Sequence, residues 1–438
     1  MRHTAFRAAV AATVVTAALL LSGCSGTSSN APKAETGPVD LTFWGWVPNM
    51  DKIVDVWNKA NPKIHVTYVK VDAGDAAATK LLTAIKAGSG APDLMQAEYQ
   101  KIPTMVSANA LLDMSKAVPA SLKSKFPAGV WSAVTLGSKG LYGIPQDSGP
   151  MMFYYRKDVF DKLGIKAAPT TWDEYAADAK IVHDADPKNF LGTFSSGDAG
   201  QFAGLTQQAG GSWWASSGGA WSVNINSDAV KKVASYWGGL VQSGVIDNKP
   251  QFTPAWNKAL ASGTQVGWVS AVWAPGVLAG NAPKTAGKWV MAPLPQWDPS
   301  APADGNWGGS AVGVTTQSKH LAAATKFDVW LNTSPEAVAQ LVSLGGLYPS
   351  DTVDSKAALS KPTDFFSNQP EFYTLAATIL GTVKPFTYGP NVNVAYSAYN
   401  DDFGKAAQSK QQADFLTAVE SMQTTTLNDL KSNGFKTK

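Results

Sequence analysis

Strand-like and helix-like segments alternate along the chain from residue 39 onward, and this alternation is the strongest constraint on its fold. Runs rich in β-branched and aromatic residues are followed each time by a run with the apolar spacing of an amphipathic helix. Strands are predicted over Val39 to Trp46, Ile64 to Val71 and Pro92 to Gln96, and helices over Met50 to Ala60, Ala76 to Ala87 and Ile102 to Asn109. The order predicts an α/β fold, a mostly parallel sheet with helices on both faces.

The length of the chain indicates more than one lobe. With 438 residues, it can bury two separate hydrophobic cores. Around Tyr142 to Arg156, two short strand-like runs are joined by polar and Gly-Pro residues, which predicts a crossing between lobes. Thr171 and Glu174 have the spacing of a capping box at the start of a helix, and Gln412 to Asn433 has helical apolar spacing.

Two loops rich in tryptophan are candidates for function. Ala209 to Ala220 is rich in Gly, Ser and Trp and lacks the periodicity of a helix or strand, and Pro293 to Gly309 is rich in Pro, Gly and Trp. The chain contains 16 tryptophans. Because a tryptophan ring is costly to expose unless something stacks on it, we expect some of them to line a site.

The amino terminus has the features of a lipoprotein signal. Arg2 and Arg7 precede an uncharged run from Ala8 to Leu21, which is typical of a secretion signal and too short for a comfortable membrane span. The run ends in Leu-Ser-Gly-Cys24, which resembles the bacterial lipobox, and Cys24 is the only cysteine. Residues 1–23 are therefore predicted to be a signal peptide, with Cys24 lipidated on a flexible tether (24–38), although Cys24 could instead be a buried thiol.

Charge and histidine content argue against several classes of function. The chain has 36 basic and 33 acidic residues, and loss of Arg2 and Arg7 with the signal makes it nearly neutral, so nucleic acid is not expected as a partner. His65, His183 and His320 are widely separated and lack metal-ligand spacing. Gly287-Lys288 lacks the other residues of a phosphate loop. We expect no metal and no cofactor.

Several segments together resemble the family of bacterial extracellular solute-binding proteins that includes the maltose-binding protein. They are Gly-Ala-Pro-Asp-Leu from Gly90, LYGIPQDSGPMMFYYRKDVFDKLG from Leu141, PTTWDEY from Pro169, ALASGTQVGWVSAVW from Ala259, NWGGSAVGVTTQSK from Asn306, DVWLNTSPEAV from Asp328 and GGLYPS from Gly345. Their order and spacing follow the family pattern over nearly the whole mature chain. No single motif carries the resemblance.

The resemblance implies a periplasmic-binding-protein-like fold of two α/β lobes that close on a ligand between them. Lobe 1 would combine 39–148 with 312–348, and lobe 2 would combine 151–308 with 352–438. Hinge crossings are predicted near 147–151, 305–313 and 348–351. The family also implies a carbohydrate ligand, delivery to the permease of an ABC importer, and a monomer anchored to the outer face of the cell membrane through Cys24.

A sugar site needs aromatic rings that stack on C–H faces and polar groups that pair with hydroxyls. Ligands sit beyond the carboxyl ends of strands in such folds, and Trp273 matches a family position that stacks on sugar. The predicted ligand-binding residues are Trp44, Trp46, Asp93, Glu98, Tyr99, Asp147, Trp213, Trp214, Trp273, Trp307, Tyr348 and Tyr388. For each, a structural role remains the alternative: Asp93 beside Pro92 could stabilise a turn, and one of Trp44 and Trp46 could be core.

Two other functions stay open from the residues. A secreted glycoside hydrolase would also combine aromatics with two carboxylates, and Asp93, Glu98 and Asp147 could supply such a pair. A binding protein of the same fold could take a non-sugar solute. The resemblance favours a sugar-binding protein that is not an enzyme.

Overall fold

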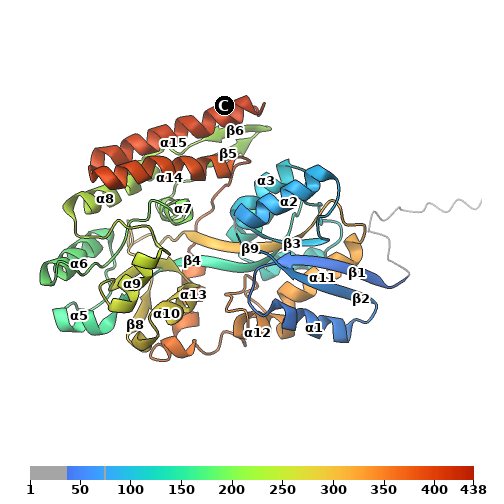
Figure 1. Ribbon diagram of the computed structural model, residues 1–438, viewed down its shortest axis with the longest axis horizontal. Coiled ribbons are helices and arrows are strands. Elements are labelled where there is room, and N and C mark those ends of the chain that lie inside the picture. The colour runs from blue at the N-terminus through green and yellow to red at the C-terminus, as the bar shows by residue number, and fades with distance from the viewer. Residues whose placement is uncertain (1–36, 74) are drawn as a thin grey trace, which may run out of the picture. The chain divides into compact units, whose positions relative to one another are not determined.

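The computed structural model describes residues 37–73 and 75–438 (Figure 1). The predicted signal peptide, Cys24 and nearly all of the predicted tether lie outside these residues. Within the described part, the strands are β1 Val39–Gly45, β2 Ile64–Lys70, β3 Leu94–Glu98, β4 Ile144–Arg156, β5 Trp214–Ser217, β6 Ala220–Val223, β7 Gly267–Ala271, β8 Trp289–Ala292 and β9 Asn306–Val314.

Helices follow most of the strands, as the alternation predicted. The α-helices are α1 Met50–Ala60, α2 Asp75–Ala87, α3 Ile102–Ser107, α4 Ala128–Thr135, α5 Lys157–Leu163, α6 Trp172–Ala185, α7 Ala199–Gln208, α8 Asp228–Ser243, α9 Pro254–Ser262, α10 Ala274–Asn281, α11 Leu321–Thr333, α12 Pro335–Ser343, α13 Phe372–Leu380, α14 Val392–Ser409 and α15 Gln412–Ser432. Short 3₁₀ helices lie at Tyr99–Lys101 (η1), Ala120–Lys125 (η2), Pro283–Thr285 (η3) and Asp364–Phe366 (η4). Across residues 37–73 and 75–438, no helix has both the length and the apolar character that a membrane span requires.

The main sheet is mixed, which corrects the expectation of a mostly parallel sheet in each lobe. Its strands run in the order β2-β1-β3-β9-β4-β7, and β8 also pairs with β4. β1 is parallel to both β2 and β3, whereas β9 is antiparallel to β3 and β4, and β7 and β8 are antiparallel to β4. The sheet is mixed because β9 lies between β3 and β4 and runs antiparallel to both of them.

Two long strands, β4 and β9, connect the two halves of the sheet (Figure 1). The crossing at residues 147–151, predicted as two short runs joined by polar residues, is one strand with bulges between Pro145 and Asp147 and between Ser148 and Pro150. Part of the predicted loop 293–309 is likewise the start of β9. Gly149 allows this close pairing, because a Cβ there would collide with the carbonyl oxygen of Trp307.

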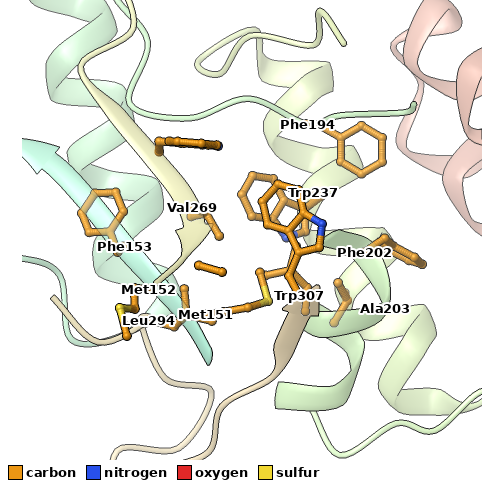
Figure 2. Packing of buried hydrophobic residues seen from close by; sticks show 14 of the residues in the cluster. Met151, Met152, Phe153, Phe194, Phe202, Ala203, Trp237, Val269, Leu294 and Trp307 are labelled. Carbon is orange, nitrogen blue, oxygen red and sulfur yellow. The ribbon is translucent and has the colours of Figure 1, made fainter. Parts of the chain in front are cut away.

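Buried hydrophobic side chains form two clusters. One draws on residues 39–144 and 311–341, and the other on residues 151–294, Trp307 and residues 348–430. Figure 2 shows part of the second cluster, in which Phe153 of β4 lies opposite Val269 of β7. The lobe boundaries remain predictions from the sequence, because a hydrophobic cluster does not define where a lobe begins or ends.

Local signals predicted some elements well and missed one. The Thr171–Glu174 capping box is present: the Thr171 side chain accepts from the Glu174 backbone, and the Glu174 side chain accepts from the Thr171 backbone. The helix predicted at Gln412 to Asn433 is α15. The segment 209–220, predicted to lack regular structure, contains most of the hairpin β5–β6, whose four-residue strands are too short for a periodic pattern.

Candidate ligand cleft

A cleft of about 400 Å³ lies where both parts of the main sheet meet α7 and α14. It is bounded by polar side chains, glycines and one tryptophan. The lining residues are Glu98, Gln100, Gly197, Asp198, Ala199, Gly200, Trp307, Gly308, Asn393, Tyr396, Ser397 and Asn400. Two sequence-predicted site residues, Glu98 and Trp307, are among them.

On one side of the cleft, polar groups follow the carboxyl end of β3. Glu98 is the last residue of this strand, and Gln100 is the second residue of η1, which follows directly. The Gln100 amide donates to the Glu98 carboxylate over 2.9 Å. A strand that ends at the cleft thus presents a carboxylate and an amide to it, as expected for the carboxyl ends of strands in open α/β sheets.

On the opposite side, Asp198 caps the first turn of α7. Its Oδ1 accepts from the Gln201 backbone N–H over 3.0 Å, and the indole of Trp307 also donates to this carboxylate. Burial raises the pKa of Asp198 to about 6, although these hydrogen bonds act in the opposite direction. The carboxylate is therefore held in place, and its pKa lies above the usual range of an aspartate.

One face of α14 completes the cleft with neutral polar groups. Asn393, Tyr396, Ser397 and Asn400 are spaced by three or four residues, so they lie on one side of the helix. Lys101 of η1 reaches this helix, since its ammonium donates to Asn393 Oδ1 over 2.6 Å and lies 5.5 Å from the Tyr396 ring centroid. Lys101 thus links η1 to α14 at one point beside the cleft.

Aromatic rings form the wall beside Asp198. Trp307 is the second residue of β9, and its ring lies 4.8 Å from that of Trp273 at an interplanar angle of 74°. The Trp273 indole donates to the Trp307 carbonyl over 2.9 Å. Trp273 is partly buried and does not line the cleft itself; it supports Trp307 from behind.

A hydrogen-bonded group joins the strands at the predicted hinge. The Tyr99 hydroxyl donates to the carbonyl of Asp147 over 3.0 Å and also pairs with Ser350 Oγ. The Asp147 carboxylate accepts from Ser310 Oγ of β9, and burial raises its pKa to about 6. Tyr348 is buried and stacks on Tyr373. These three predicted residues lie at the crossings and not in the cleft.

Tyr388 lies close to the cleft without lining it. It shares a smaller neighbouring cavity with Tyr99 and Asn306, and it packs against both hydrophobic clusters. Its pKa is raised by burial and by the negative charge of Glu98, and Tyr396 forms a hydrogen bond with it. The structure thus brings Tyr388 next to two residues of the cleft.

The remaining predicted residues lie elsewhere. Asp93 precedes β3, at the end opposite Glu98, and its carboxylate accepts from the Thr42 backbone N–H (2.9 Å) and from Ser318 Oγ (2.6 Å), so it holds strands together. Trp213 and Trp214 are fully buried, which leaves them no surface for a ligand. They are core residues because their indoles donate to Thr206 and Asn391 inside the second cluster.

Trp44 lies within β1 and Trp46 follows this strand, and neither lines the cleft. Trp44 is partly buried, and the Lys80 ammonium lies 4.1 Å from its ring centroid. Trp46 is also partly buried, and its backbone N–H donates to Gln96 Oε1 over 3.0 Å. Both pack against the first hydrophobic cluster.

The sequence of the chain matches a known protein family. The model of the family described as "Bacterial extracellular solute-binding protein" matches residues 45–338, about two thirds of the chain. The chain belongs to this family. The predicted family and α/β fold class are confirmed.

Two relatives within the solute-binding proteins cover most of the chain. An arabinooligosaccharide-binding protein of Bacillus subtilis is 25% identical over 425 residues, which is 93% of each protein. A lactose-binding protein of Rhizobium radiobacter is 24% identical and covers 87% of this chain and 91% of its own.

Two solved structures of sugar-binding proteins are similar to this chain. One is the galacto-N-biose/lacto-N-biose I-binding protein of the ABC transporter from Bifidobacterium longum in complex with lacto-N-biose, with a TM-score of 0.82 and 30% identity over 92% of this chain and all of that one. The other is a transporter-associated binding protein from B. animalis subsp. lactis in complex with β-1,6-galactobiose, with a TM-score of 0.78 and 28% identity over 92% of this chain and all of that one.

Several cleft residues of this solute-binding protein were not predicted from the sequence. They are Gln100, Asp198, Asn393, Tyr396, Ser397 and Asn400. The polar residues of α14 do have a visible signal, a stripe at three- and four-residue spacing on a helix that is otherwise apolar on its buried side. Asp198 resembles any helix N-cap in the sequence, so nothing separated it from structural caps. In residues 37–73 and 75–438, no group of three or more His, Cys, Asp or Glu side chains is arranged to hold a metal.

Proposed function

We propose that the chain is the extracytoplasmic substrate-binding component of an ABC importer and that it captures a neutral oligosaccharide. The observation that carries the proposal is the cleft in which Trp307 lies beside two carboxylates, Glu98 and Asp198, opposite the amides and hydroxyls of α14. An aromatic face can stack on a sugar ring while carboxylates and amides pair with its hydroxyls.

The charge of the cleft supports a neutral ligand. Its ionisable carboxyl groups are Glu98 and Asp198, and the Lys101 ammonium, which contacts Asn393 and Tyr396, is not part of its lining. A phosphate or carboxylate ligand would meet like charge on both sides, which is unfavourable in a partly desolvated site. The sugar-binding relatives support the same class of ligand.

Capture would proceed by closure of the two lobes on the sugar. A ligand that contacts both sides of the cleft favours the closed form by its differential affinity. The permease would then recognise the closed form, and lipid on Cys24 would hold the protein at the outer face of the membrane. We expect the binding protein to act as a monomer.

A glycoside hydrolase is the second candidate, because Glu98 and Asp198 both line one cleft. The family is one of binding proteins, which favours capture without cleavage. Asp93 and Asp147, the other acids considered for catalysis, are engaged by Thr42 and Ser318 and by Ser310, outside the cleft.

Thermal unfolding of residues 32–438, which contain the compact described part of the chain, tests the proposal. The unit is melted with galactose, lactose, lacto-N-biose, β-1,6-galactobiose and arabino-oligosaccharides, and each sugar is recovered and checked for cleavage. A sugar at 100 times its Kd stabilises the folded state by about 2.7 kcal/mol, which gives a clear shift in Tm.

The outcomes separate the candidates. A shift with an intact di- or oligosaccharide supports the binding protein and names its sugar class. A shift with cleaved sugar favours the hydrolase. The absence of a shift with every sugar would contradict the proposed ligand and direct the search to other solutes.

A further inference from the structure

Phe252 has an unusual backbone and an unusual exposure. Its φ angle is 63°, a left-handed conformation that large side chains rarely adopt. The residue is nevertheless 44% exposed, although its ring lies 5.5 Å from that of Trp256 and 6.0 Å from that of Trp268. Strained residues of this kind persist where the surrounding structure imposes them, and they are concentrated at functional sites.

The neighbours on both sides fix this conformation. The backbone N–H of Gln251 donates to Ser195 Oγ over 3.2 Å, and the Gln251 side chain accepts from the Trp268 indole over 2.9 Å. On the other side, Thr253 is the N-cap of α9, and its hydroxyl accepts from the Trp256 backbone N–H. The turn therefore holds Phe252 outward between two anchored residues.

The Phe252 ring extends the aromatic wall of the cleft. Its centroid lies 6.1 Å from that of Trp307, which lines the cleft, and 6.2 Å from that of Trp273. The turn that carries Phe252 also lies close to the cleft residue Gly197. A Cβ added to Gly197 would lie 3.7 Å from Pro250, two residues before Phe252. Phe252 thus packs against the tryptophan that lines the cleft, and part of the residue remains exposed.

We propose that Phe252 is a specificity-determining residue that stacks on a second sugar ring, next to the ring held by Trp307. The assignment rests on the proposed function and deepens it, since it selects sugars of two or more rings over a single one. The two aromatic planes are tilted by 56°, so one flat sugar ring cannot cover both. A disaccharide can place one ring against each.

Phe252→Gly is the informative variant because it separates affinity from stability. Glycine adopts a positive φ without strain, so loss of the ring is offset by relief of the backbone and the Tm stays close to that of the wild type. The dissociation constant for the disaccharide rises about tenfold through loss of aromatic stacking. Phe252→Tyr keeps the stacking surface and restores the wild-type affinity.

A matched control removes another exposed apolar side chain. Ile181 on α6 is likewise 44% exposed and does not line the cleft, so Ile181→Ala leaves the dissociation constant unchanged. Titration calorimetry with lactose, lacto-N-biose, β-1,6-galactobiose and arabino-oligosaccharides is compared with galactose for all four proteins. Binding of galactose changes less than twofold in Phe252→Gly.

Two results would overturn the assignment, and they differ. If the wild type binds a disaccharide and Phe252→Gly binds it equally well, Phe252 has no role in binding and the proposed function survives. If the wild type binds none of these sugars, the proposed function fails and the role of Phe252 fails with it. An equal loss for galactose and the disaccharide would place Phe252 at the first ring and reject selection by length.

Discussion

Asp93, Asp147 and Asp198 carry the same carboxyl group in three different surroundings. Asp93 is bound to Thr42 and Ser318 at the amino end of β3, Asp147 accepts from Ser310 at the hinge, and Asp198 lines the cleft. The sequence predicted the first two as ligand residues and did not single out the third, which lines the cleft. A carboxylate is assigned to a site by what surrounds it, and those partners come from distant segments of the chain.

At Asp198, sugar binding should depend on pH. A sugar hydroxyl donates to the ionised carboxylate, so binding favours the charged form, whereas burial raises the pKa of the free protein to about 6. Affinity is therefore highest above this pKa and falls as pH decreases through it. Between pH 7.5 and pH 5 we expect the dissociation constant to rise up to about tenfold, measured by titration calorimetry.

Two variants assign this pH dependence. Asp198→Asn has no titrating carboxyl and should bind more weakly at pH 7.5 with a flat profile. Asp147 also has a pKa of about 6, but it faces Ser310, so Asp147→Asn should keep the wild-type slope. A slope that disappears only in Asp147→Asn would move the effect to the hinge.

Among the elements, those with long periodic patterns could be predicted and short ones could not. The segments expected at residues 50–60 and 412–433 are α1 and α15, within one residue at each end. β5 and β6 have four residues each, and the two tryptophans before and within this hairpin were therefore assigned to a functional loop. Only their contacts with α7 and with Asn391 show that they belong to the core.

Packing of β5 against the segment before α14 gives an element-scale prediction. A Cβ at Gly389 would collide with the Trp214 ring, which is fully buried and cannot move aside easily. Gly389→Ala should lower the free energy of unfolding by about 1–3 kcal/mol, as overpacking of a filled core does. Urea unfolding followed by circular dichroism measures this change.

Gly276 within α10 is the matched control. A Cβ there meets no atom within 4 Å, and alanine is a better helix former than glycine. Gly276→Ala should therefore be neutral or stabilise the protein by up to about 1 kcal/mol. Equal destabilisation by both substitutions would show that the contact with Trp214 is not the cause.

For the whole molecule, the sequence predicted a two-lobe α/β fold but not the nature of its crossings. The region from Tyr142 to Arg156 was predicted as two short strands joined by polar and Gly-Pro residues, yet a single strand, β4, spans residues 144–156 with bulges. A strand pattern read along one chain does not reveal that β9 pairs with this segment from far down the sequence. The pairing of β4 with β9 is therefore visible in the fold and not in the local sequence.

Closure of the lobes is the prediction at this scale. Small-angle scattering of residues 32–438 should show a smaller radius of gyration when the stabilising sugar is added, because a ligand that contacts Glu98 and Asp198 together draws the two sides closer. A sugar that gives no thermal shift serves as control. An unchanged radius at saturation would mean that the cleft binds without closing.

β3 and its partner strand β9 lie far apart in the sequence, so β3 is synthesised long before it can form this pairing. Glu98 pairs with Ser310, and Ala311 and Val312 of β9 belong to the same buried cluster as the earliest strands. The ribosome makes residues 151–294 of the second cluster before it makes β9. The sheet that begins with β1, β2 and β3 therefore stays incomplete while the segments between β3 and β9 are made, and the edge of β3 lacks its partner strand during that time.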